Sequence, residues 1–293
     1  MMIPYKKINR IVTDIMGPGV HDVIPLKKGI TNNSYIFTCR GQRYVLRLNG
    51  AGTERLINRK GELESYTAIS SCGISDEIIA IDADKGYKIT RFVENAHNCN
   101  PYNGRDVKLC MEKLRHFHKL KIKSGSIFDL YGTLEYYETL WTRRASKYKD
   151  YAAIKKQVYA LKPMLDTIDR NSFVLTHMDP VSDNFLITDT DQVYLIDWEY
   201  AGMQDMYVDL AMFAIYTGYT RAETDRLINV YFDGACPDEI YWRIYAYQAI
   251  GGLLWSNWCE FKEDMGIYFD TYPDVQYRYA KDCSKLALNM LMS

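Results

Sequence analysis

Between residues 20 and 94 the chain alternates apolar and polar positions in short runs, a pattern typical of strands that bury one face. The runs SYIFTC and RYVLRL are separated by Arg40 and Gly41 alone, which predicts a tight hairpin. A second pair of runs, EIIAID and YKITRFV, flanks a turn at residues 84–86. We therefore predict a region of mostly strands, joined in hairpins, in the first third of the chain.

The spacing of apolar residues becomes helical at Thr53 and again beyond residue 95. The first helix is expected to end at Cys72 and Gly73, and the remainder of the chain to be mostly helical. One apolar stripe consists of Leu63, Tyr66 and Ile69, and another of Val107, Cys110, Leu114 and Phe117. Further helices are expected near residues 136–148, 151–168, 206–217, 221–232, 239–262 and 274–291.

Residues 172–210 interrupt the helical pattern with short strands and polar turns. The pattern predicts a strand over residues 173–176, a polar loop over 177–184 and a hairpin that turns at 189–191. An acid, Asp197, ends the last of these strands. Polar side chains are thus expected to lie directly beside short apolar strands.

Three side chains of this stretch, Asp179, Asn184 and Asp197, have types and spacing that suit phosphoryl transfer. Such chemistry needs one carboxylate to orient a hydroxyl and accept its proton. It also needs a second carboxylate and an amide oxygen to hold the Mg²⁺ ions that neutralise the phosphates of ATP. His and Asp also cap ordinary turns, but an HxDxxxxN loop followed by a strand-terminal Asp is the arrangement of protein-kinase catalytic machinery.

Composition narrows the class of protein. The 293 residues are 47% hydrophobic and 25% charged, which is typical of a globular chain long enough for two lobes. With 36 Lys and Arg against 37 Asp and Glu, no net field favours nucleic acid or an anionic membrane. No run reaches the ~18 apolar residues of a membrane span, and the N-terminus lacks the apolar core of a secretory signal.

Seven scattered cysteines without CxxC spacing indicate free thiols rather than disulfides or a zinc site. Together with the absence of a signal or span, this predicts a cytoplasmic protein. The sequence sets no oligomeric state.

The acid at the strand end lies in IDWEYAG rather than in the DFG of protein kinases, and Asp209 follows it by twelve residues at the start of an apolar helix. This variant resembles the choline kinase and aminoglycoside phosphotransferase superfamily. The phrases GTERLINR, LIDWEYAGMQD and LLWSNW are similar to those of bacterial LicA-type choline kinases. The resemblance implies an α+β, protein-kinase-like fold with a β-rich N-terminal lobe over residues 1–94 and a helical C-terminal lobe over residues 95–293.

The resemblance also implies that ATP binds between the lobes. Arg47 alternates with Leu46 and Leu48, so its side chain points away from the face that these leucines bury. In kinases a cation at this place contacts the phosphates of ATP, and an acid of the next helix holds it. Glu62 fits that acid best by its spacing, with Glu64 as the alternative; without the resemblance, Arg47 would be interpreted as a solvated strand arginine.

Two backbone segments complete the implied nucleotide site. The loop KKGITNNSY, which contains Thr31 and Asn32, has small residues that allow its backbone to approach phosphates. The segment after the second hairpin would be the hinge between the lobes, where the backbone of Arg91, Phe92 and Val93 binds adenine. His118 matches a position that is often His in the superfamily. We interpret it as a buried packing or hydrogen-bonding residue, because it has no acid or thiol partner at metal spacing.

Aromatic residues are concentrated near the C-terminus, with 14 in the 49 residues from Tyr231 to Tyr279, about twice the 14% of the whole chain. Trp255 and Trp258 share a helix face, and Tyr272 follows beyond a loop. Such a stripe often belongs to a core. Aromatic faces also attract a quaternary ammonium, and in choline kinases a WxxW helix and a following tyrosine form the choline pocket.

The acid that would lie near this ammonium is left open among Glu199, Glu223 and Glu260. The segment AIYTGYTRAE departs from eukaryotic choline kinases, which carry an acid and a further tyrosine there. We place Glu199 in the expected substrate site together with Asp179 and the aromatic residues.

The sequence thus predicts a kinase that uses ATP and Mg²⁺ to phosphorylate the hydroxyl of choline or a related amino alcohol, giving phosphocholine and ADP in the case of choline. The alternatives are a sister kinase for ethanolamine, an aminoglycoside, thiamine or homoserine, and a catalytically inactive nucleotide-binding scaffold. An acid-lined pocket would favour an aminoglycoside. The intact Asp179, Asn184 and Asp197 argue against the scaffold.

Overall fold

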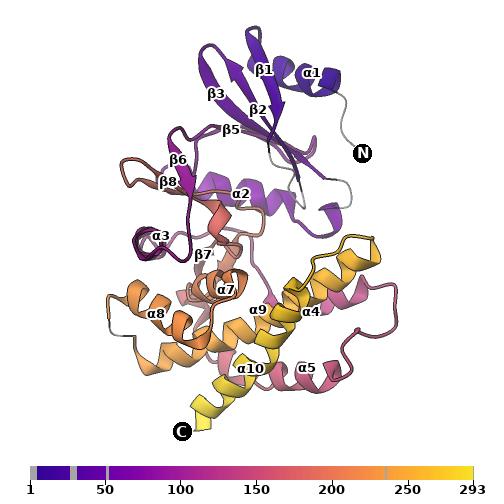
Figure 1. Cartoon of the computed structure of the whole chain (residues 1–293), viewed down its shortest axis with the longest axis vertical. Helices are drawn as coiled ribbons and strands as arrows, with labels where there is room; N and C mark the ends of the chain where they lie inside the picture. Colours follow the sequence, from indigo (N-terminus) through magenta and orange to yellow (C-terminus); the bar gives the residue numbers. More distant parts are fainter. Residues whose placement is uncertain (1–4, 27–31, 51–52, 235, 293) are drawn as a thin grey trace.

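The computed structural model describes residues 5–26, 32–50, 53–234 and 236–292. A five-stranded antiparallel sheet forms the N-terminal part, and helices with two small sheets lie below it (Figure 1). The chain therefore has the mixed α+β architecture that the sequence predicts. The five strands, in the order β1-β2-β3-β5-β4, are β1 (Val20–Pro25), β2 (Asn32–Cys39), β3 (Gln42–Asn49), β4 (Ile78–Asp82) and β5 (Tyr87–Arg91).

Both predicted hairpins of this sheet are confirmed. Cys39 pairs with Gln42, so Arg40 and Gly41 alone make the first turn. Both turn residues have positive φ, 51° for Arg40 and 74° for Gly41, as a two-residue turn that matches the twist of the strands requires. The second hairpin joins β4 to β5 and turns through Gly86.

A helix that the sequence analysis did not predict, α1 (Tyr5–Met16), packs on this sheet (Figure 1). Ile8 and Val12 of α1 are buried in one cluster with Phe37, Leu46 and Ile89 of the strands. A sheet buries an apolar face only against another layer, and α1 supplies that layer.

The opposite face of β3 carries Arg47, which contacts the helix α2 (Arg59–Ile69). This helix begins later than predicted, because η1 (Thr53–Arg55) is a short 3₁₀ turn and the Asn58 side chain caps α2 by accepting from a backbone N–H. The predicted stripe is also partly wrong, since Leu63 is only half-buried. The buried positions of α2 are Gly61, Glu62, Ser65, Tyr66 and Ile69.

Two small sheets lie on either side of the polar loop of residues 177–184. One contains β6 (Ala96–Asn98), β8 (Phe185–Thr188) and β9 (Val193–Leu195), which confirms the predicted hairpin. The other pairs β7 (Val174–Thr176) with β10 (Gly202–Gln204), a strand that was not predicted. Gly202 is required there, because a Cβ atom would lie 2.8 Å from the backbone nitrogen of Phe128.

The remaining elements are helical. They are α3 (Gly104–Lys119), α4 (Leu130–Thr139), α5 (Tyr151–Tyr159), α6 (Lys162–Leu165), α7 (Val208–Thr217), α8 (Arg221–Phe232), α9 (Asp238–Asp264) and α10 (Tyr272–Met292), with the 3₁₀ turns η2 (Arg170–Ser172) and η3 (Ser182–Asn184). The stripe predicted for α3 is buried, and α7 to α10 lie close to their predicted positions. None of the described helices has both the length and the apolar character needed to cross a membrane.

The helix predicted over residues 136–148 is wrong beyond Thr139. The chain after this point is held by side chains of α9 instead; for example, the Lys147 N–H donates to the Glu260 carboxylate at 3.0 Å. Such tertiary contacts override a modest helical propensity. The helix predicted over residues 151–168 is likewise divided into α5 and α6.

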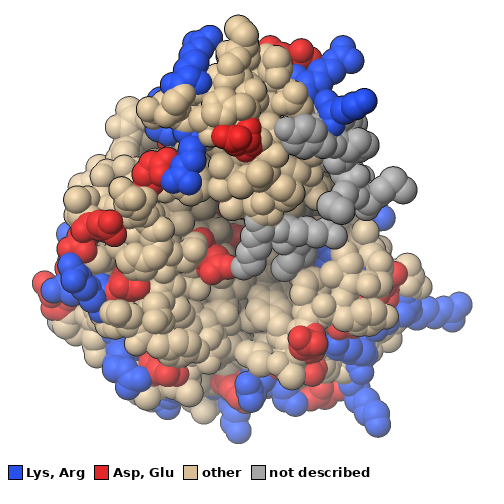
Figure 2. Space-filling model, turned by 45° about the horizontal axis from the view of Figure 1, so that its top comes forward, with Lys and Arg blue, Asp and Glu red and all other residues tan. Residues whose placement is uncertain are grey.

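The centre of the helical part is α9, in which every residue from Ile244 to Lys262 is buried. It packs against α4, α5, α7 and α10. Figure 2 shows acidic and basic side chains interspersed over one face of the molecule, which agrees with the formal net charge of −1. Charged ligands must therefore be held by local groups rather than by a global field.

Candidate active site

A carboxylate from α7 fixes the loop of residues 177–184. Asp209 accepts hydrogen bonds from the backbone N–H groups of His177 at 3.0 Å and Met178 at 2.8 Å. It also lies 3.0 Å from Nε2 of His118 on α3, and Nδ1 of His118 is 2.8 Å from the Tyr231 hydroxyl on α8. His118 is therefore a buried hydrogen-bonding residue, as the sequence analysis expects. Through Asp209, three helices hold the loop in one position.

The imidazole of His177 orients the first half of the loop. Its Nε2 lies 2.9 Å from the Ile196 carbonyl, and its Nδ1 accepts the Asp179 N–H at 3.2 Å. Burial lowers the pKa of His177, which favours the neutral ring that can donate at one nitrogen and accept at the other. The ring also packs edge-to-face on Trp198, with centroids 4.7 Å apart. His177 therefore positions Asp179 by its backbone.

The Asp179 carboxylate is the most perturbed acid of the loop. Burial, followed by the charges of Asp197 and Glu199, raises the pKa of Asp179 well above its usual value. The Asn184 amide nitrogen donates to the Asp179 carbonyl at 2.9 Å and is 3.4 Å from its carboxylate. Tyr216 of α7 donates to the Met178 carbonyl at 3.3 Å, and its hydroxyl partly offsets the rise in the pKa of Asp179. These contacts hold Asp179 in place while its charge is destabilised.

The pKa of Asp197 is shifted in the opposite direction, below its usual value. Burial works against its charge, but Arg47 and then Lys88 outweigh burial and hold the pKa of Asp197 below its usual value. Its backbone has a φ of 66°, and the preceding Ile196 N–H donates to the Asn184 carbonyl at 2.9 Å. Asn184 and Asp197 are thus tied together by adjacent backbone. Neighbouring carboxylates with separated pKa values are suited to different roles.

Arg47 lies at the centre of a buried group of ion pairs. It contacts Glu62 and Asp197 directly, and its Nη1 is 3.2 Å from the Glu199 carboxylate. Glu62, rather than Glu64, therefore meets Arg47, and Glu64 is exposed on α2. Strand alternation turned Arg47 inward, where it is 6% exposed, so it is not a solvated arginine.

Two further cations of this group were missed from the sequence. Arg59 Nη1 lies 2.8 Å from Glu62 and 3.0 Å from Glu199, and Lys88 Nζ lies 3.6 Å from Glu62. Lys88 faces Arg47 across β3 and β5, so the same alternation rule would have placed it on the inner face. Arg59 ends the phrase GTERLINR, but nothing in its spacing revealed a partner more than a hundred residues away.

Only some of the residues predicted to bind the nucleotide lie beside this group of ion pairs. Asn32 donates to Glu199 at 2.8 Å, while Thr31 lies outside the described residues. The N–H groups of Arg91 and Phe92 donate to the carbonyls of Glu77 and Arg43, at 2.8 Å and 3.0 Å. A cavity of about 550 Å³ adjoins this hinge segment, between α2 and the β8–β9 hairpin.

Aromatic rings gather beside Asp179. Trp255 packs edge-to-face on Tyr200, with centroids 5.4 Å apart, and lies 5.6 Å from the Tyr216 ring. The Trp255 and Trp258 rings are 6.0 Å apart, as their shared helix face predicts. Tyr272 lies in the same region. Burial, then Cys259 and then the charge of Asp179 raise the pKa of Tyr272, which indicates that Asp179 is nearby.

Three of these rings, Tyr200, Tyr216 and Phe269, were not predicted from the sequence. Phe269, in the loop before α10, lies 5.2 Å from Trp258. Tyr216 belongs to the segment AIYTGYTRAE, in which the sequence offered no acid to mark a substrate site. Among the described protein groups, the buried hydroxyls of Tyr137 and Tyr200 and the Trp258 indole N–H have no hydrogen-bond partner.

The three candidate acids are all engaged by protein groups. Glu199 is bound to Arg47 and Arg59, and Glu260 accepts from Ser146 and from the Lys147 N–H. Glu223 is an exposed member of a capping box at the start of α8. The aromatic rings therefore lie close to the carboxylates of Asp179 and of the guanidinium-bound Glu199, while Glu223 and Glu260 are held elsewhere.

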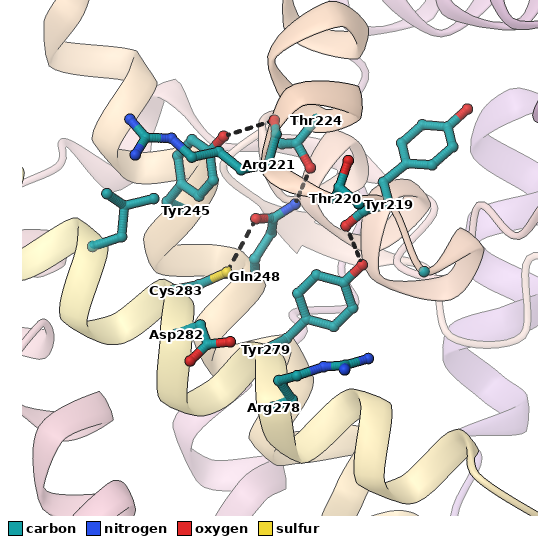
Figure 3. Close-up of a pocket in the computed structure, with 12 residues that line it drawn as sticks. Tyr219, Thr220, Arg221, Thr224, Tyr245, Gln248, Arg278, Tyr279, Asp282 and Cys283 are labelled. Carbon is teal, nitrogen blue, oxygen red and sulfur yellow. Dashed lines mark hydrogen bonds between the residues drawn. The ribbon is translucent and has the colours of Figure 1, made fainter.

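A separate cavity of about 460 Å³ lies between the start of α8, α9 and α10 (Figure 3). Its polar lining is internally hydrogen-bonded: the Gln248 amide donates to Thr224 at 3.3 Å, and Tyr279 donates to the Tyr219 carbonyl at 2.6 Å. None of the predicted site residues lines this cavity.

The fold and this site define a family. Residues 22–253 match the model of the phosphotransferase enzyme family (APH), and the chain belongs to that family. It is a small-molecule kinase that transfers phosphate to an alcohol group.

Individual members and solved structures of this family are also similar to the chain. The chain is 24% identical to Protein LicA of Haemophilus influenzae over 254 residues, which are 83% of this chain and 74% of the relative. Its fold is similar to that of choline kinase LicA from Streptococcus pneumoniae, with a TM-score of 0.82 and 24% identity over 96% of this chain and 98% of the other. A choline/ethanolamine kinase family protein from Mesorhizobium loti also gives a TM-score of 0.82, at 21% identity over 98% and 99% of the two chains.

Proposed function

We propose that this kinase transfers the γ-phosphoryl group of ATP to the hydroxyl of choline, giving phosphocholine and ADP. The observation that carries this proposal is the set of aromatic rings, Tyr200, Tyr216 and Trp255, beside the half-buried carboxylate of Asp179. The similarity to LicA and to choline/ethanolamine kinases supports the same acceptor class.

Asp179 is the proposed base. A hydroxyl bound beside its carboxylate is oriented toward the phosphate, and its proton passes to the carboxylate late in a loose transition state. The raised pKa of Asp179 makes it a better proton acceptor than an ordinary aspartate, provided that it is ionised when the acceptor binds. Tyr216 and Asn184 orient the carboxylate.

Asn184 and Asp197 are the proposed metal ligands, and their oxygen donors fit Mg²⁺. The Asn184 amide nitrogen is used by the Asp179 carbonyl, so its amide oxygen remains for a cation. Asp197 keeps an ionised carboxylate that is 31% exposed. Mg²⁺ bound there would neutralise charge on the phosphates of ATP.

The proposed phosphate contact is Arg47, which Glu62 holds in place. Asn32 and Thr31 are proposed to lie over the phosphates, and the backbone of Arg91, Phe92 and Val93 to contact adenine. The two lobes of residues 1–94 and 95–293 would then close on ATP from opposite sides, in the cytoplasm, where ATP is available.

The rings suit the trimethylammonium group of choline. That group cannot donate a classical hydrogen bond, and each aromatic face contributes ~0.5 to 2 kcal/mol to its binding, with the upper end where water is excluded. Trp255 and Trp258 are at most 5% exposed, so water has little access to their rings.

Ethanolamine is the second candidate acceptor, and a specific observation favours it. The buried hydroxyls of Tyr137 and Tyr200 have no partner among the described protein groups, and a primary ammonium can donate to both oxygens. A trimethylammonium group would leave them unpaired.

A coupled ADP-release assay with a panel of alcohols tests the proposal. Choline should give the highest kcat/KM, with ethanolamine next, and an aminoglycoside, thiamine and homoserine should give little turnover. A preference for one of the last three would overturn the acceptor assignment. No acceptor-dependent ADP release with any alcohol would favour the inactive scaffold.

A further inference from the structure

Lys262 is a buried cation on the helix that carries the tryptophans. It follows Trp258 by four residues and Trp255 by seven, so the three side chains share one face of α9. Its side chain is only 2% exposed. Lysine is almost never fully buried unless it is paired, which makes this position unusual.

The partner of Lys262 is an aromatic ring. Its Nζ lies 5.3 Å from the centroid of the Trp258 ring, within the range of a cation–π contact. Lys147, near the same end of α9, pairs with Glu263 at 2.7 Å, whereas the described part of the chain offers Lys262 no such carboxylate. The charged group that acts on it is Glu199, which Arg47 and Arg59 already hold.

We propose that Lys262 is a specificity-determining residue of the acceptor pocket, because its ammonium takes up the cation-binding capacity of Trp258 and directs the ammonium of the acceptor to the Trp255 side. This inference rests on the proposed function and refines it. The pocket then contains two unequal tryptophans: Trp255, framed by Tyr200 and Tyr216, receives the acceptor, and Trp258 mainly holds Lys262.

The physical reason is repulsion between like charges in a poorly hydrated site. Two ammonium groups that share one ring lie within several ångströms of each other, and little water is present to screen them. Lys262 therefore weakens the binding of any cationic acceptor, while a neutral alcohol of the same shape feels no such repulsion.

The test compares choline with its neutral isostere, the alcohol in which carbon replaces the quaternary nitrogen. Lys262→Met keeps most of the apolar stem and removes the charge. We expect kcat/KM for choline to rise by about tenfold, equivalent to ~1.4 kcal/mol, while kcat/KM for the isostere changes by less than about twofold. Lys262→Arg, which retains the charge, should behave like the wild type. Lys156→Met, an exposed site on α5, controls for the loss of a positive charge and should change neither value.

A merely structural lysine would change both alcohols in the same proportion, and that result would overturn the inference while choline turnover upheld the proposed function. If neither the wild type nor Lys262→Met turns over choline, the inference and the proposed function are both overturned. If Lys262→Met does not fold, the tryptophans provide the second test: Trp255→Ala should lower kcat/KM for choline several-fold more than Trp258→Ala, and equal losses would contradict the inference.

Discussion

Asp179 and Asp197 are neighbouring carboxylates whose pKa values are shifted in opposite directions by their surroundings. Asp179 is half-buried and has no ion pair among the described residues, whereas Asp197 contacts Arg47 and lies 3.7 Å from Lys88. The pKa of the first is raised and that of the second is lowered. This difference is the physical basis for assigning the base to Asp179 and the metal ligand to Asp197.

The two replacements Asp179→Asn and Asp197→Asn should therefore separate in their effects. Asp179→Asn should lower kcat by ~10² to 10⁴ with nucleotide affinity nearly unchanged, because it removes general-base catalysis alone. Asp197→Asn should also weaken the binding of Mg-ATP. Steady-state kinetics together with calorimetric titration of Mg-ATP measures both effects, and equal weakening of nucleotide binding in the two variants would contradict the roles.

Asp179→Asn should also make the protein more stable. The folded-state pKa of Asp179 lies above its unfolded value, so the charged carboxylate costs stability above the folded pKa. That cost vanishes below the unfolded pKa, which is about 3.9. The melting temperature of the variant should exceed that of the wild type near neutral pH, and the difference should shrink as the pH falls. Asp282→Asn, an exposed acid on α10, should show no such gain.

At the scale of elements, the loop of residues 177–184 depends on a contact from α7. Asp209 receives two backbone N–H groups of the loop and His118 of α3. Asp209→Asn keeps the volume of the side chain but turns one acceptor oxygen into a donor. We expect a loss of about 3 kcal/mol in the free energy of unfolding, because buried N–H donors that Asp209 satisfies are left without an acceptor. Denaturant titration measures this loss, and a change below about 0.5 kcal/mol would mean that the loop is held by other contacts.

The pairing of β3 with α2 makes a second prediction at this scale. Arg47 contacts Glu62 in a buried setting, while Glu64 is exposed two positions later. A double-mutant cycle on Arg47 and Glu62 should show a coupling well above the ~0.2 to 1 kcal/mol of exposed pairs. The matched cycle on Arg47 and Glu64 should be nearly additive. Coupling at Glu64 instead would overturn the assignment of Glu62.

Elements with strong local patterns could be predicted from the sequence. The β2–β3 hairpin follows from alternation and from the turn at Arg40 and Gly41, and the loop with Asp179 and Asn184 follows from its spacing. The pattern failed where distant contacts decide the structure. The 136–148 segment leaves the helix because α9 binds it.

The residues of the candidate site divide in the same way, into those that local spacing indicates and those that only the fold brings together. Asp179, Asn184 and Asp197 lie in one local stretch and were singled out as candidates by their spacing. Arg59 acquires its role only because the fold brings it to Glu199, which is 140 residues away in the chain. Lys262 was not singled out either, since a lysine near the end of a helix ordinarily reaches solvent.

At the scale of the whole molecule, the proposed acceptor site is built from several segments that meet. The catalytic loop, α7, α9 and the residues after β9 each contribute side chains beside Asp179. The face shown in Figure 2 has acidic and basic side chains interspersed over much of its area. We therefore attribute selection of the acceptor to the proposed site rather than to a global field.

The direct measurement is transfer of label from γ-labelled ATP to choline, with the product identified as phosphocholine by mass spectrometry. We predict choline-dependent formation of labelled phosphocholine by the wild type, and its near-complete loss in Asp179→Asn while the protein still binds Mg-ATP. Label that appears only as inorganic phosphate, or transfer that is unchanged in Asp179→Asn, would contradict the account.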